Sequence, residues 1–60
     1  MNINLQFTSI SDLRYWLKRK ADECGDPESY NDWLSAFFDE GNTITVHGEE
    51  YDYWSCWELL

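Results

Sequence analysis

The chain has 60 residues, a net charge of −8 and an aromatic fraction of 18%. This length allows one domain, residues 1–60, near the lower size limit for a chain that folds alone. The aromatic content is enough for a compact core, which argues against disorder despite the charge. No apolar run exceeds three residues, which excludes a signal peptide and a transmembrane helix, so we expect a complete cytoplasmic protein.

The charge is distributed very unevenly along the chain. The first third has four cations against one carboxylate, Asp12, a local net charge of +3. Residues 21–60 contain eleven carboxylates and no Lys or Arg, a local net charge of −11. Such an asymmetry indicates a polarised surface rather than an evenly solvated one. The four cations are Arg14, Lys18, Arg19 and Lys20.

Residues 3–8 alternate apolar and polar side chains, which predicts a half-buried strand. A helix is expected next, over residues 10–24. Ser9 with Asp12 three residues later approximates a capping box, and Gly25 is a natural C-terminal stop. The apolar positions that recur at helical spacing are Ile10, Leu13, Trp16, Leu17, Ala21 and Cys24.

A second helix is predicted from Asp26 to the stop at Gly41. Asp26 is suited to the N-cap, Pro27 to the first helical position and Glu28 to the positive end of the helix dipole. One face is aromatic and apolar, at i, i+3, i+4, i+7 and i+8. Its members are Tyr30, Trp33, Leu34, Phe37 and Phe38.

The remaining segment, "NTITVHGEEYDYWSCWEL", is interpreted as a β-hairpin. The resulting β-α-α-β-β order predicts an α+β domain, with a three-stranded antiparallel or mixed sheet and two helices packed on one face. A two-residue turn at Gly48-Glu49 pairs Val46 with Tyr51 and Ile44 with Tyr53. In that register Trp54 and Cys56 share the outer, polar face of the sheet, and a one-residue slip exchanges the two faces.

Catalytic and metal-binding patterns are lacking. The single histidine, His47, falls in the expected turn, and there is no glycine-rich loop to hold an anion. Cys24 and Cys56 show no metal-ligand spacing, and a pair of thiols is favoured over a disulfide. We therefore expect a protein that is not an enzyme and has neither a cofactor nor a metal.

The basic segment "RYWLKRK" is the one feature that favours direct nucleic-acid binding. Lys18 and Asp22, and likewise Arg19 and Glu23, are i,i+4 partners, which predicts local neutralisation. The remaining acidic surface repels phosphate. Direct binding of nucleic acid is therefore not expected.

The polar face of the second helix is more informative. Glu28, Asp32, Ser35 and Asp39 lie within about 60° of one another, opposite the aromatic stripe. The acids are separated by roughly 6 and 10 Å along the axis, comparable with one or two steps along a nucleic-acid backbone. No cation separates them, so the face is either simply solubilising or adapted to a basic partner.

In size, acidity and aromatic content the chain resembles the accessory proteins with which bacteriophages and prophages inhibit host enzymes. Its acidic helix followed by "EGNTITVHGEEYDYW" is also similar, in acidity and aromatic content, to antirestriction proteins that imitate DNA. Those proteins are usually larger. The resemblance implies a stoichiometric inhibitor of a nucleic-acid-handling host protein, acting in the host cytoplasm.

The sequence therefore predicts an acidic protein-binding module whose charges approach a basic partner while aromatic side chains anchor the contact. The alternative is a structural or self-associating domain that forms a homodimer through the Trp54/Cys56 face of the sheet, so a monomer or a weak homodimer is expected. The expected partner-binding residues are the acids Glu28, Asp32, Asp39, Glu40, Glu49, Glu50 and Asp52, with Tyr15 and Trp54 as exposed anchors.

Overall fold

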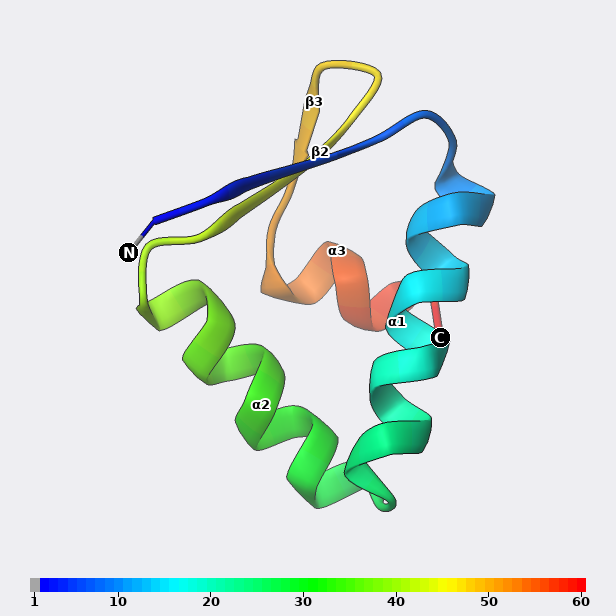
Figure 1. The fold of residues 1–60 in the computed structure, drawn as a ribbon, viewed down its shortest axis with the longest axis vertical. Coiled ribbons are helices and arrows are strands. Elements are labelled where there is room, and N and C mark those ends of the chain that lie inside the picture. Colours follow the sequence, from blue (N-terminus) through cyan, green and yellow to red (C-terminus); the bar gives the residue numbers. More distant parts are fainter. Residues whose placement is uncertain (1) are drawn as a thin grey trace.

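A computed structural model describes residues 2–60 and confirms the α+β class (Figure 1). The order of elements is β-α-α-β-β-α, which differs from the predicted β-α-α-β-β order by a third helix that the sequence did not predict. The elements are β1 (Asn4–Phe7), α1 (Ile10–Cys24), α2 (Pro27–Asp39), β2 (Thr43–Val46), β3 (Glu49–Tyr51) and α3 (Tyr53–Glu58).

The three strands form one mixed sheet in the order β1-β2-β3. β1 pairs with β2 in parallel and β2 with β3 in antiparallel orientation, so α1 and α2 together make the crossover that a parallel pair requires. Figure 1 shows all three helices on the same side of the sheet. The sheet thus has one face towards the helices and one polar face towards solvent.

Local side-chain chemistry fixes the ends of the two long helices, as predicted. The Ser9 hydroxyl accepts a hydrogen bond from the Asp12 N–H at 3.1 Å, and Asp26 Oδ1 accepts one from the Ser29 N–H at 2.8 Å. Gly25 follows α1 with a φ of +90°, a left-handed conformation that favours glycine. The chain therefore reverses between α1 and α2 within Gly25 and Asp26.

The core lies between the helices and the inner face of the sheet. Its side chains come from all three helices and from β2, and the accessible surface of 4211 Å² is close to the roughly 4,100 Å² expected for a compact chain of this mass. Rings of Trp16, Trp33 and Phe37 pack around it with centroid separations of 5.6–6.0 Å. The buried residues are Leu13, Leu17, Tyr30, Leu34, Ile44, Val46 and Cys56.

The predicted hairpin is present, but its turn lies one residue earlier than expected. His47 and Gly48 form the turn with φ values of 53° and 81°, the positive pair that a type I′ turn needs to match the twist of its strands. Ile44 consequently faces Tyr51, whereas the predicted partner of Tyr51 was Val46. The register differs by two residues, so Tyr51 keeps the predicted inner face.

The prediction that β3 extends through residues 53–57 is wrong, because these residues form α3. Asp52 caps this helix, its Oδ1 accepting a hydrogen bond from the Ser55 N–H at 2.8 Å. Six residues are too few to hold a helix by themselves, so packing must stabilise it. Trp57 packs edge to face on Tyr30 with ring centroids 5.3 Å apart.

Candidate acidic docking surface

All nine side chains predicted to bind a partner are exposed. The two aromatic members are the most informative, because large apolar side chains normally avoid solvent. Tyr15 on α1 is 56% exposed and Trp54 on α3 is 70% exposed. The surface therefore presents both the acids and the aromatic side chains that a docking site needs.

The acidic row along α2 has the predicted geometry. Glu28, Asp32 and Asp39 are exposed, while Tyr30 and Leu34 on the other side of the helix are buried. The row contains no cation, because residues 21–60 have no Lys or Arg. Helix α2 therefore presents an anionic face to solvent along its whole length.

A contact between α2 and α3 joins the helix that carries this row to the residue that precedes Trp54. The Tyr53 hydroxyl donates a hydrogen bond to Asn31 Oδ1, and the Tyr53 ring packs edge to face on the Trp54 ring with centroids 5.1 Å apart. Asn31 lies beside Asp32 and one helical turn from Glu28. Sequence reasoning missed this contact, because it placed Tyr53 in a strand.

Asp52 adds a fixed negative charge at the same place. It is exposed and precedes Trp54 by two residues. The hydrogen bonds that its carboxylate accepts from the Ser55 backbone and side chain hold the pKa of Asp52 below its ordinary value. We call the set formed by Glu28, Asp32, Asp52 and Trp54 the α2–α3 surface.

Other predicted members are not brought together with this surface. Glu49 and Glu50 are consecutive residues of β3, so their side chains point to opposite faces of the sheet. Asp39 and Glu40 lie at the end of α2 that leads into β2, away from the α1–α2 loop (Figure 1). The predicted anionic surface is thus divided among several parts of the molecule.

The Trp54/Cys56 face that supported the homodimer alternative does not exist. The two residues are two positions apart in a helix, which separates them by about 200° around its axis. Trp54 consequently faces solvent, while Cys56 is fully buried in the core. Burial and the nearby Asp52 charge raise the pKa of the Cys56 thiol to about 11, so it stays protonated at neutral pH.

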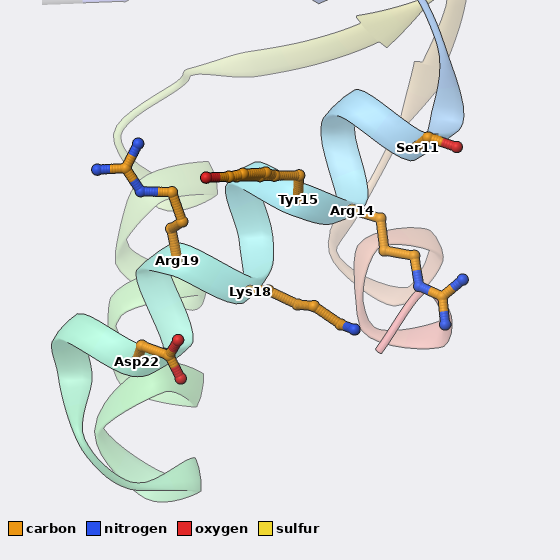
Figure 2. A pocket seen from close by; sticks show the side chains of 6 residues that line it. All are labelled: Ser11, Arg14, Tyr15, Lys18, Arg19 and Asp22. Atoms are coloured by element: carbon orange, nitrogen blue, oxygen red, sulfur yellow. The ribbon is translucent and has the colours of Figure 1, made fainter.

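A basic groove runs along the exposed side of α1 (Figure 2). Figure 2 shows the Arg14 and Lys18 side chains extending to one side of the helix and those of Tyr15 and Arg19 to the other. The Arg19 guanidinium carbon lies 6.0 Å from the centroid of the Tyr15 ring. Every lining residue belongs to α1, so the groove is a shallow space between the side chains of one helix.

The expected i,i+4 ion pairs of α1 do not form. Within residues 2–60 the only ion pair joins Lys20 Nζ to Glu23 Oε1 at 3.6 Å, an i,i+3 pair. Lys18 and Arg19 are exposed, and Figure 2 shows their side chains directed away from Asp22. Exposed long side chains lose conformational entropy when an ion pair fixes them, so such pairs gain little. The basic side of α1 is therefore less neutralised than the sequence suggested.

The described part of the chain offers little for metal or membrane chemistry. Across residues 2–60, no three His, Cys, Asp or Glu side chains gather in a way that would hold a metal ion. None of the helices in this range is long and apolar enough to cross a membrane.

Comparison of the chain with protein-family models, with curated proteins and with solved structures finds no match.

Proposed function

We propose that this protein is a noncatalytic binding module whose α2–α3 surface docks on a basic, nucleic-acid-binding surface of a partner protein. Occupying that surface excludes the nucleic acid, which makes the module a stoichiometric inhibitor, with the host cytoplasm as its site of action. The observation that carries the proposal is Trp54, which is 70% exposed in the part of the chain, residues 21–60, that has eleven carboxylates and no Lys or Arg.

The exposed tryptophan argues for a protein partner. An acidic face alone serves solubility, but an exposed indole works against it. Tryptophan is among the residues that most often dominate binding energy when an interface buries them. Burying the exposed part of Trp54 contributes roughly 2 kcal/mol from the hydrophobic effect.

The acids decide which partner surface fits. Glu28, Asp32 and Asp39 repeat along α2 at separations of roughly 6 and 10 Å, on the scale of the spacing between backbone phosphates. A groove that binds phosphates through Lys and Arg also attracts such a row. Long-range attraction chiefly raises the association rate, and the row excludes nucleic acid itself as a ligand.

Affinity capture from a bacterial lysate tests this proposal. The test variant combines Glu28→Gln, Asp32→Asn and Asp39→Asn. The matched control combines Asp12→Asn, Glu23→Gln and Glu49→Gln, which removes the same charge away from both the α2 row and α3. We expect the control to capture the same partner as the wild type and the test variant to lose it. Equal recovery by both variants would refute the acidic docking surface.

Two further measurements establish the mode of action. One equivalent of the module should release nucleic acid from the captured partner, and several hundred millimolar salt should weaken capture markedly. Trp54→Ala should weaken it by at least tenfold, as loss of a central aromatic anchor does. A partner that binds the module and nucleic acid simultaneously would exclude the inhibitory mechanism.

Self-association is the competing function, and it has lost its predicted interface because Cys56 is buried. Light scattering over a dilution series separates the two possibilities. We expect a monomer throughout, since each copy has a net charge of −8 and repels another. A dimer that persists on dilution and in high salt would favour the structural function instead.

A further inference from the structure

A hollow of about 270 Å³ lies where the end of α1, the start of α2 and the C-terminal segment meet. The rings of Tyr30 and Trp57 form part of its wall, and the exposed residues Asp22 and Asp26 stand at its rim. Gly25 also lines it, and a Cβ at that position would meet no atom within 4 Å. The hollow is therefore open above the Gly25 backbone and large enough for one long side chain.

The electrostatics of the hollow favour a cation. It lies at the C-terminal, negative end of the 15-residue helix α1, whose last turn contains no basic residue. Asp22 and Glu23 occupy that turn, although carboxylates are unfavourable at this end of a helix. Lys20 pairs with Glu23, which leaves Asp22 without an ion-pair partner within residues 2–60.

The positive N-terminal end of α2 does not cancel the negative potential at the C-terminal end of α1. The positive end of α2 is already occupied by its own capping carboxylate, because Asp26 accepts hydrogen bonds from the Ser29 N–H at 2.8 Å and the Ser29 hydroxyl at 3.1 Å. Glu28 adds a second negative charge in the first turn. Both helix ends at the hollow thus present negative charge to an incoming group.

The aromatic wall makes the hollow more than a cluster of acids. Tyr30 and Trp57 pack edge to face with centroids 5.3 Å apart, and a cation is attracted to such rings as well as to carboxylates. Tyr30 is only 2% exposed, and its hydroxyl has no hydrogen-bond partner in the described residues. That hydroxyl is buried and does not open into the hollow, so the half-buried Trp57 is the ring that an incoming cation can contact. A hollow with carboxylates at its rim and an aromatic wall fits a side chain that is both charged and partly apolar.

We propose that this hollow binds the guanidinium group of an arginine side chain from the basic partner. Arginine fits better than lysine, because its planar group is weakly hydrated, stacks on aromatic rings and donates two parallel hydrogen bonds to a carboxylate. The identity of the partner rests on the proposed function, whereas arginine recognition by the hollow does not. The inference adds a specific side-chain pocket beside the α2–α3 surface.

A nuclear magnetic resonance titration tests the hollow without any partner protein. N-α-acetyl-L-arginine amide should shift the Trp57 indole N–H and the Gly25 amide with a dissociation constant on the order of 1 mM, near the limit for so small a ligand. The citrulline analogue has nearly the same shape without the charge and should bind at least fivefold more weakly. The lysine analogue should bind more weakly than the arginine analogue.

Matched variants locate the binding site. Asp22→Asn and Asp26→Asn should each weaken binding by about two- to fivefold, the range for exposed ion pairs. Asparagine at position 26 is itself a good N-cap, so α2 keeps its start. Asp12→Asn, the control at the opposite end of α1, should leave binding within about 1.5-fold of the wild type.

Several outcomes would overturn the inference. Equal binding of the citrulline analogue, an equal loss in Asp12→Asn, or shifts at Trp54 instead of Trp57 would each show that the hollow is not an arginine site. Arginine amide binding without partner capture would refute the proposed function and leave the hollow standing. Capture of the partner by the wild type without arginine amide binding would refute the arginine site and leave the proposed function standing.

Discussion

Replacing Tyr30 with phenylalanine removes a buried hydroxyl that has no hydrogen-bond partner in residues 2–60. Leaving such a group unpaired costs about 1–3 kcal/mol. Phenylalanine keeps the ring that packs against Trp33 at 6.0 Å and Trp57 at 5.3 Å. We therefore expect Tyr30→Phe to raise the free energy of unfolding by about 1 kcal/mol, which corresponds to about 4–8 °C in Tm for a domain of this size.

Urea denaturation followed by tryptophan fluorescence measures this change directly, and a thermal melt provides an independent value. Tyr53→Phe is the matched control, because the Tyr53 hydroxyl donates a hydrogen bond to Asn31. The control should lower the free energy of unfolding by about 0.5–1.5 kcal/mol, the opposite sign. A loss of about 1 kcal/mol or more in Tyr30→Phe would refute the reasoning, since it would mean that the hydroxyl is satisfied in the folded state.

Three further predictions concern backbone conformation and pH. Gly25→Ala should lower the free energy of unfolding by about 1–2 kcal/mol because of its φ of +90°, whereas Gly25→Asn should cost clearly less in the same urea titration. His47→Asn should raise stability by a few tenths of a kcal/mol, since asparagine accepts the positive φ of the type I′ turn more readily; an unchanged or lower urea midpoint would contradict this. Burial raises the pKa of Cys56 to about 11 and that of Tyr30 to about 12, so both groups ionise first in the unfolded chain. Stability measured by urea titration at successive pH values should therefore be nearly constant between about pH 6 and 9 and fall between pH 9 and 12, with a smaller fall in Tyr30→Phe.

The sequence predicted the elements whose signals are local. Ser9, Asp26 and Pro27 mark helix starts because their side chains bond to, or suit, the backbone within a few residues. The spacing of apolar residues also predicts the buried face of α2, and Tyr30 and Leu34 on that face are buried. These features depend on neighbours three or four residues away, which the sequence displays directly.

The C-terminal segment was misread because two local signals compete there. Tyrosine and tryptophan favour strands, and the alternation of "EYDYW" supports that interpretation. The same segment contains an Asp with a Ser three residues later, Asp52 and Ser55, which repeats the spacing of Asp26 and Ser29 at the start of α2. That repeated capping pattern was the signal that could have identified α3.

The site was predictable in its composition but not in its assembly. Exposure of the α2 acids follows from helical periodicity and charge, and the structure shows it. Trp54 is exposed as predicted, but through its place on α3 and not through the strand alternation from which its exposure was inferred. The contact between Tyr53 and Asn31 joins residues 22 positions apart, and no local pattern encodes it. The hollow between Asp22, Asp26 and Trp57 is likewise a product of packing among three segments.

The pairing of β1 with β2 has a consequence for the order of folding. The Ile3 N–H donates to Asn42 Oδ1 and the Thr43 N–H to the Ile3 carbonyl, both at 2.9 Å, across a separation of about 40 residues. Closing a loop of that length costs roughly 3 kcal/mol of entropy beyond a constant term. Packing of α1 against α2 shortens this loop, so β1 and β2 are expected to pair after the two helices have packed. The first strand to be synthesised is therefore among the last to be placed, and a nascent chain that ends before residue 46 has no sheet to join.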